Sequence, residues 1–215
     1  MTDHISAVSY LERDASVLSR DDQAAMTERL RHQMAAFRPW NEQEARDRDM
    51  MMALLDSPGV FTRENQAVHF TASAWICDAE RRRVLMAFHK IYQSWAWTGG
   101  HADGERDLLQ VALREAREET GIIASPLTED IFSLEVLTVD GHEKRGQYVP
   151  SHLHLNITYL LEADKKQKIR IKADENAGVA WFSLEEALEK CSEPWMRQRI
   201  YTKLNEKLRA FAVEE

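Results

Sequence analysis

The sequence is poor in cysteine: Cys77 and Cys191 stand far apart among 215 residues. So few thiols exclude a disulfide framework and a zinc cluster built on cysteine. Glycine (8) and proline (5) are also scarce, which excludes collagen-like and low-complexity chains. No apolar run approaches the length of about 18 residues that a membrane span needs, and residues 1–20 carry charges where a signal peptide is apolar. We therefore expect a soluble protein of a reducing compartment, most simply the cytoplasm.

Basic residues are outnumbered by acidic ones, 28 to 36, and the formal net charge is −8. An anionic surface repels nucleic-acid backbones and anionic lipid, so neither a nucleic acid polymer nor a membrane is expected as a partner. A small polyanionic substrate remains compatible with this charge when a divalent metal ion screens it. Hydrophobic residues at 44% and charged residues at 30% are ordinary values for a globular domain.

Residues 1–64 have the character of an N-terminal helical extension. Apolar residues recur there at helical spacing in three stretches, about residues 5–18, 26–37 and 42–55. Ser57-Pro58-Gly59 then ends the pattern, and no motif in the extension carries chemistry. The apolar stripes fit a homodimer interface, a lid or plain packing onto the rest of the chain, and a homodimer is our expectation.

Residues 65–215 alternate between strand and helix patterns, which predicts a mixed α/β domain. Strand-like runs are expected at residues 68–77, 83–91, 131–139, 153–161 and 179–182. A Gly-rich loop is expected over residues 99–104, and an amphipathic helix over about 107–120 follows it. Ser183 and Glu186 form a capping box that begins a C-terminal helix.

Three carboxylates gather on one face of the helix expected over residues 107–120. Glu115, Glu118 and Glu119 share that face of an α-helix, where like charges repel and destabilise a bare helix. A hard cation makes the arrangement favourable, because Mg²⁺ and Mn²⁺ prefer oxygen ligands and Mg²⁺ sites commonly combine carboxylates with substrate phosphates. Arg114 can neutralise or orient one carboxylate. The alternative is a solvated acidic face, which such charge runs also form.

The stretch from Gly100 to Ile122, GHADGERDLLQVALREAREETGI, resembles the box of the Nudix (MutT-like) hydrolases, G-x5-E-x7-R-E-U-x-E-E-x-G-U, in which U is a bulky apolar residue. The positions in register are Gly100, Arg114, Glu115, Glu118, Glu119, Gly121 and Ile122. Two positions depart, because Arg106 replaces the first Glu and the small Ala116 replaces the first U. Trp97-Thr98-Gly99-Gly100 and Val179-Ala180-Trp181-Phe182 are also similar to the domain around that box.

This resemblance implies an α/β/α sandwich with a mixed sheet. It also implies a pyrophosphohydrolase, dependent on Mg²⁺ (or Mn²⁺), that cleaves a nucleoside diphosphate linked to another moiety by attack of water on phosphorus. Carried over by position, the metal ligands are Glu115, Glu118, Glu119 and the carbonyl of Gly99, and Arg114 orients the carboxylates. The general base is either Glu115 or a residue of a later loop. Glu175 is the matching candidate in that loop, and a plain turn residue is the alternative interpretation.

Other residues are candidates for substrate binding. His152 and His154 are two apart in a strand-like run and therefore face the same side of the sheet. There they bind phosphate or a metal ion, or simply lie on an exposed face. His101 lies in the Gly-rich loop, Trp97 precedes that loop and can stack on a base, and Arg145 lies in a polar loop where it can meet phosphate. The alternatives are an exposed loop histidine, a core tryptophan and a solvated arginine.

Two other functions fit parts of the sequence. The first is a non-catalytic Nudix-fold module that senses a nucleotide metabolite, but such a module is expected to lose box carboxylates, and all three are present. The second is an isopentenyl-diphosphate isomerase, whose loop is similar to Trp97-Thr98 and Gly100-His101. The cysteine expected in that loop is missing between Trp95 and Asp107. Hydrolysis of a small-molecule nucleoside diphosphate derivative is therefore the leading prediction.

Overall fold

The computed structural model describes residues 19–144 and 146–214 of the chain. Its strands are β1 Val68–Cys77, β2 Arg83–His89, β3 Ser94–Ala96, β4 Thr98–His101, β5 Ser125–Pro126, β6 Ser133–Val139, β7 His142–Lys144, β8 Gln147–Val149, β9 His152–Glu162 and β10 Asn176–Ser183. The main sheet runs in the order β10-β2-β1-β9-β5, with β3 paired to β2, β4 to β1 and β6 to β9, while β7 and β8 form a separate hairpin. The sheet is mixed, because β1 and β9 are parallel and their other neighbours are antiparallel.

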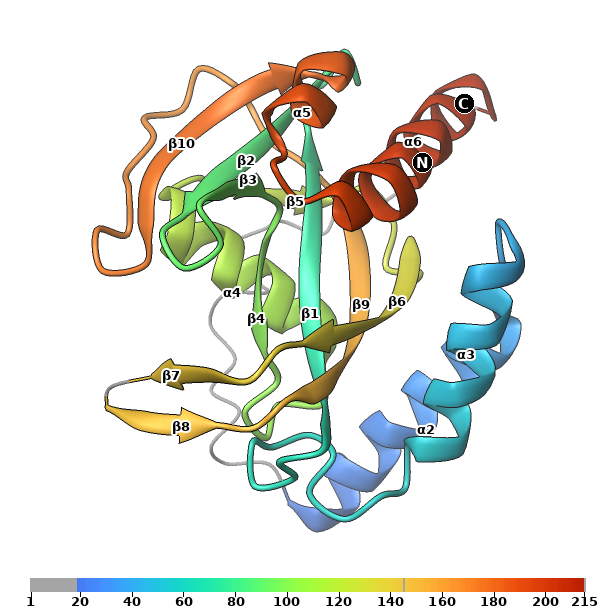
Figure 1. The fold of residues 1–215 in the computed structure, drawn as a ribbon. Helices are drawn as coiled ribbons and strands as arrows, with labels where there is room; N and C mark the ends of the chain where they lie inside the picture. Colours follow the sequence, from blue (N-terminus) through green and yellow to red (C-terminus); the bar gives the residue numbers. More distant parts are fainter. Residues whose placement is uncertain (1–18, 145, 215) are drawn as a thin grey trace.

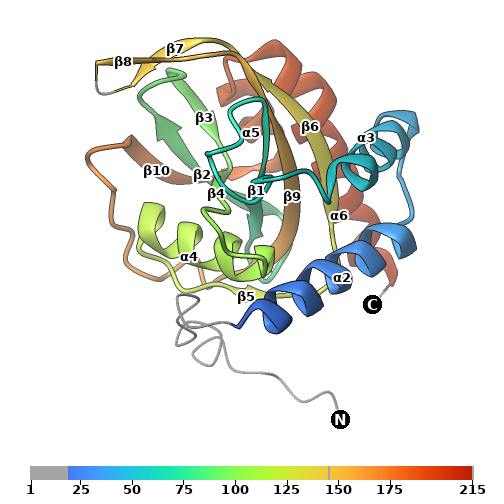
Figure 2. The ribbon, with the colours of Figure 1, turned by 90° about the horizontal axis from the view of Figure 1, so that it is seen from below.

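Helices lie on both faces of this sheet. They are α2 Arg20–Ala36, α3 Glu42–Leu54, α4 Leu108–Thr120, α5 Leu184–Lys190 and α6 Thr202–Glu214, with a π-helical segment, η2, at Met196–Tyr201. The helix α4 packs on one face, α5 and α6 cover the other, and α3 lies beside β6 (Figure 1, Figure 2). The predicted α/β/α sandwich with helices before it in the chain is confirmed.

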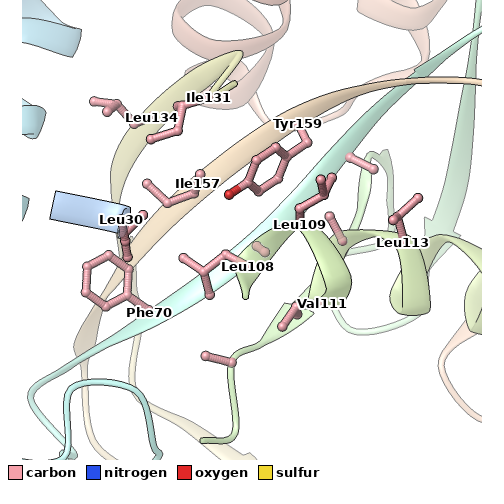
Figure 3. Packing of buried hydrophobic residues seen from close by; sticks show 14 of the residues in the cluster. Leu30, Phe70, Leu108, Leu109, Val111, Leu113, Ile131, Leu134, Ile157 and Tyr159 are labelled. Atoms are coloured by element: carbon pink, nitrogen blue, oxygen red, sulfur yellow. The ribbon is translucent and has the colours of Figure 1, made fainter. Parts of the chain in front are cut away.

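Alternation along β1 divides the hydrophobic core into two layers. Phe70 points into the layer shared with α4, where Figure 3 shows it near Leu108 and Ile157. Trp75 points to the other face and stacks on Tyr201 of η2, with ring centroids 5.3 Å apart. Each large apolar side chain removed from water stabilises the fold by about 1.5–3 kcal/mol. These layers hold β1 rigidly between α4 and the C-terminal helices.

The expected amphipathic helix is observed as α4, and its ends have local causes. The side chain of Asp107 caps the first turn by accepting the backbone N–H of Gln110 at 3.3 Å. Gly121 ends the helix with a φ of 73°, a left-handed conformation that favours glycine. Because both ends are set locally, the register of the acidic residues on α4 follows directly from the sequence.

Parts of the chain differ from expectation. The segment expected to begin a Gly-rich loop is strand β4, because residues 98–101 pair with residues 71–74 of β1, and this long-range pairing overrides the local glycine content. The polar loop after β6 contains the β7–β8 hairpin. The first expected helix, residues 5–18, lies outside the described residues.

The N-terminal helices share a core with the sheet. Leu30 and Met34 of α2 and Met51 of α3 are buried in the same layer as α4. The hydrophobic core thus continues across the proposed boundary between an extension over residues 1–64 and a domain over residues 65–215. This division remains a proposal. Within the described part of the chain, every helix is too short or too polar to cross a membrane.

Candidate active site

The C-terminal half of α4 presents its acidic residues to the ends of three strands. The side chain of Glu119 is 1% exposed. Its Oε1 accepts the backbone N–H of Gly99 at 2.9 Å, and its Oε2 accepts the side-chain amide of Asn176 at 3.1 Å. The Nε2 atom of His89 lies 3.6 Å from the same Oε2. The Glu119 carboxylate is thereby positioned by β4, β10 and β2 together.

Glu115 lies directly against Gly100. A Cβ atom at position 100 would lie 2.5 Å from the carboxylate carbon of Glu115. Only glycine, which has no Cβ atom, therefore allows the Glu115 carboxylate to occupy this position. The Glu115 side chain is 15% exposed, and the guanidinium of Arg114 lies 3.5 Å from its Oε1. Three of the residues predicted for the metal site, Glu115, Glu119 and Gly99, are thus brought together around the β4–α4 contact.

Glu118 is more exposed than its two neighbours and lies between two cations. Its carboxylate is 4.0 Å from Nε of Arg114 and 3.6 Å from Nζ of Lys172. The same Lys172 ammonium binds Glu175 at 2.9 Å. Glu175, the loop candidate for the general base, is therefore joined to the acidic face of α4 through one shared lysine.

Burial makes two of these carboxyl groups unusually basic. Burial raises the pKa of Glu119 to about 8, and this effect exceeds the lowering by the hydrogen bonds from Gly99 and Asn176. Burial also raises the pKa of Glu115, against the opposing attraction of Arg114. A divalent cation would offset both effects, because it stabilises the ionised form of a carboxyl group. The donor set therefore fits Mg²⁺ or Mn²⁺, which prefer carboxylate oxygens.

The predicted histidines gather in a second group. The rings of His152 and His154 lie on one face of β9 with centroids 4.9 Å apart, and His101 lies 4.9 Å from His154. His101 is the last residue of β4 rather than part of a free loop. The structure thus brings the three histidines to one another and away from the α4 side of β4.

Two further candidates for substrate binding are placed differently. Trp97 is only 8% exposed, and its ring packs edge-on against Tyr201 with centroids 5.5 Å apart. This is the packing of a core side chain, the alternative considered from the sequence. Arg145 lies outside the described residues.

Sequence reasoning missed several residues that contact the predicted ones. They are His69, His89, Lys172 and Asn176. None belongs to a local motif with the acidic helix, and each reaches its partner only through strand pairing or a loop that returns to α4. The one available signal was weak: His69 stands near the start of the expected strand over residues 68–77, where a polar side chain is unusual in a buried run.

Comparison with known proteins defines the class of protein. The sequence profile of the NUDIX domain matches residues 67–203, which span more than half of the chain. Together with the α/β/α sandwich, this match shows that the chain belongs to the Nudix hydrolase family. Members of this family generally use divalent metal ions.

Curated relatives within the family are bis(5'-nucleosyl)-tetraphosphatases (asymmetrical). The protein of Mus musculus is 36% identical over 97 residues, which cover 44% of this chain and 59% of the relative. The protein of Sus scrofa is 32% identical over 108 residues, or 49% of this chain and 66% of the relative. The chain thus matches less than two thirds of the length of these relatives.

Solved structures show the same fold. The binary complex of a C. elegans Ap4A hydrolase superposes with a TM-score of 0.50 at 22% identity, over 68% of this chain and 98% of that chain. A NUDIX hydrolase from Nitrosomonas europaea also has a TM-score of 0.50, at 19% identity, over 66% of this chain and 88% of that chain. At these identities the likeness is one of fold alone.

Proposed function

We propose that this protein is a Mg²⁺- or Mn²⁺-dependent pyrophosphohydrolase that cleaves a nucleoside diphosphate linked to another moiety. The observation that carries the proposal is that Glu119 and Glu115 of α4 lie against Gly99 and Gly100, with Glu118 on the same helix between Arg114 and Lys172. Like charges on one face of a helix repel each other, and a bound divalent cation would offset that repulsion. Phosphate oxygens complete such a cation's ligands.

The residues around the carboxylates have distinct parts in this chemistry. Glu115, Glu118, Glu119 and the carbonyl of Gly99 would hold the cation, which when bound neutralises phosphate charge and lowers the pKa of water. Asn176 fixes one oxygen of Glu119, and Arg114 orients Glu115 and Glu118. Either Glu115 or Glu175 accepts the proton of the attacking water.

For the substrate, we propose a dinucleoside polyphosphate as the first compound to test. The support is the activity of the curated relatives, which are bis(5'-nucleosyl)-tetraphosphatases. Such a small, polyanionic substrate agrees with the net charge of −8 once a cation screens the phosphates. A homodimer and a cytoplasmic location remain predictions from the sequence.

The decisive experiment is a turnover screen with Mg²⁺ or Mn²⁺ over dinucleoside polyphosphates, sugar nucleotides, nucleoside triphosphates and coenzyme pyrophosphates. Products are separated by anion-exchange chromatography. We expect at least one compound to be cleaved and Glu118→Gln to lower kcat/KM at least tenfold, about 1.4 kcal/mol of transition-state stabilisation. The matched control, Glu189→Gln, alters an exposed glutamate on α5 and should keep full activity.

The screen also separates the hydrolase from the alternative functions. Absence of turnover by the wild-type protein, with nucleotide binding still measurable by calorimetry, would refute the hydrolase and favour a nucleotide sensor. Conversion of isopentenyl diphosphate, included as a further compound, would instead indicate an isomerase.

A further inference from the structure

Four histidines from three strands lie together at one end of the sheet. They are His69 on β1, His101 on β4, and His152 and His154 on β9. Five of their six ring pairs have centroids between 4.9 and 5.1 Å apart. Strand pairing creates the group, because His69 stands directly opposite His154 in the β1–β9 register. We refer to these four residues as the histidine cluster.

The histidine cluster is separate from the carboxylates of α4. Side chains alternate between the two faces of a strand, and the Cβ position of Gly100 points at Glu115 of α4. The next residue, His101, therefore points to the opposite face of β4. His69 likewise alternates with Phe70, which packs in the α4 layer. A ligand bound by the histidines would occupy a different place from a cation bound by α4.

The histidine cluster offers nitrogen lone pairs at short range. One ring nitrogen each of His69, His101 and His154 lies within 4.8 Å of the other two. The Nδ1 atom of His69 lies 3.0 Å from the carbonyl of Asn65, and since a carbonyl only accepts, Nδ1 carries the proton. The Nε2 atom of His69 is buried and has no hydrogen-bond partner among the described residues. The lone pair of this Nε2 atom faces the histidine cluster and accepts no hydrogen bond there. Nε2 is thus an unsatisfied buried polar atom, which is unfavourable.

His152 sets the protonation pattern of its neighbour. Its Nδ1 donates to the carbonyl of Pro150 at 2.9 Å, so its Nε2 is unprotonated and accepts a hydrogen bond from the Nε2–H of His154 at 3.1 Å. Nδ1 of His154 is then left unprotonated. Burial, together with the neighbouring imidazoles, lowers the pKa of His154 to about 2, and burial also lowers the pKa of His69.

We propose that His69, His101 and His154 bind one transition-metal ion of the zinc class, and that His152 orients His154. Imidazole nitrogens suit Zn²⁺ and its transition-metal neighbours, whereas Mg²⁺ and Mn²⁺ prefer oxygen. A ligating histidine characteristically donates its other ring N–H to a carbonyl, as His69 does to Asn65. Three protein ligands leave a fourth position open for water or for an oxygen of a bound anion. This site goes beyond the proposed hydrolysis, which uses α4.

Titration of metal-free protein with ZnCl₂ tests the site, in the presence of excess Mg²⁺ to occupy the carboxylates. We expect one equivalent of Zn²⁺ per chain by calorimetry, and a visible absorption band of a tetrahedral site when CoCl₂ replaces ZnCl₂. His69→Gln and His154→Gln should each weaken Zn²⁺ binding at least tenfold. The matched control His32→Gln, which alters a side chain 76% exposed on α2, and Glu118→Gln should both bind as the wild type does.

Three outcomes of the same titration would overturn the proposal. Binding that survives both histidine variants, binding lost in Glu118→Gln, or no one-to-one binding by the wild type would each do so. Circular dichroism checks that the variants fold. If a variant is unfolded, NMR of the wild-type protein provides the test. Zn²⁺ must then shift the imidazole proton signals of the histidine cluster and leave the imidazole proton signal of His32 unchanged. Because we expect Glu118→Gln to lower kcat/KM at least tenfold but to leave Zn²⁺ binding unchanged, failure of one proposal is distinguishable from failure of the other.

Discussion

The two adjacent glycines of β4, Gly99 and Gly100, have different neighbours. Substituting one of them should therefore affect activity, and substituting the other should affect stability. A Cβ atom at position 100 would meet the carboxylate of Glu115, the free end of a flexible side chain. A Cβ atom at position 99 would lie 2.6 Å from the backbone oxygen of Ala72 and 2.9 Å from Cα of Ser73. Those backbone atoms belong to β1 at the centre of the sheet and cannot yield locally.

We therefore expect Gly100→Ala to fold normally but to lose at least tenfold in kcat/KM, because Glu115 is displaced. Gly99→Ala should instead lower the free energy of unfolding by about 1–3 kcal/mol, since β4 must move away from β1. Urea denaturation and turnover of one substrate, measured on both variants, check the pair. Full activity in Gly100→Ala would contradict the role given to Glu115.

At the scale of elements, the short helix α5 depends on its first turn. Ser183 accepts the backbone N–H of Glu186 at 3.1 Å, and Glu186 accepts the backbone N–H of Ser183 at 2.8 Å. This capping box is the one that the sequence predicted. The helix has only seven residues, so few internal hydrogen bonds support it. It nevertheless buries Leu184 and Ala187 in the layer beneath α6.

Ser183→Ala should therefore destabilise the protein by about 1 kcal/mol, which corresponds to a fall in Tm of about 2–4 °C for a chain of this size. Ser183→Thr retains the hydroxyl cap and serves as the matched control with a smaller change. Differential scanning calorimetry on the three proteins makes the comparison. Equal Tm values for Ser183→Ala and the wild type would show that α5 is held by packing alone.

Across the whole molecule, a buried ionic network connects α3 with β6 and α6. Glu44 of α3 and Glu135 of β6 both bind Lys203 of α6, at 3.2 and 3.0 Å, and Glu44 also binds Lys207 at 2.9 Å. The two glutamates are fully buried. Although burial favours a neutral amine, Glu135 and Glu44 raise the pKa of Lys203 above its usual value. The network thus connects α3 with α6.

Removing the shared cation should affect stability strongly. In Lys203→Met, two buried carboxylates lose a partner, and we expect the free energy of unfolding to fall by about 3–5 kcal/mol. Lys190→Met, which replaces an exposed lysine at the end of α5, should change the free energy of unfolding little. Urea denaturation with a common m-value measures both. A loss below 1 kcal/mol in Lys203→Met would mean that packing, rather than the network, holds the N-terminal helices.

Features that depend on local periodicity and local caps were predictable from the sequence. The acidic face of α4 is one of them, because Asp107, Gly121 and the helical repeat all lie within one short stretch. The family resemblance rested on that same stretch. The expected strand over residues 68–77 agrees with β1 at both ends, because half of its residues are β-branched or aromatic and favour the extended conformation.

Contacts between residues far apart in the sequence were not predictable from local patterns. The segment over residues 98–101 is a strand because β1 supplies its hydrogen-bond partners, and Asn176 reaches Glu119 across 57 positions of the chain. His69 and His154 become neighbours through a parallel pairing between strands far apart in sequence. Such contacts depend on how the hydrophobic layers pack around the sheet, and no local pattern of residues encodes that arrangement.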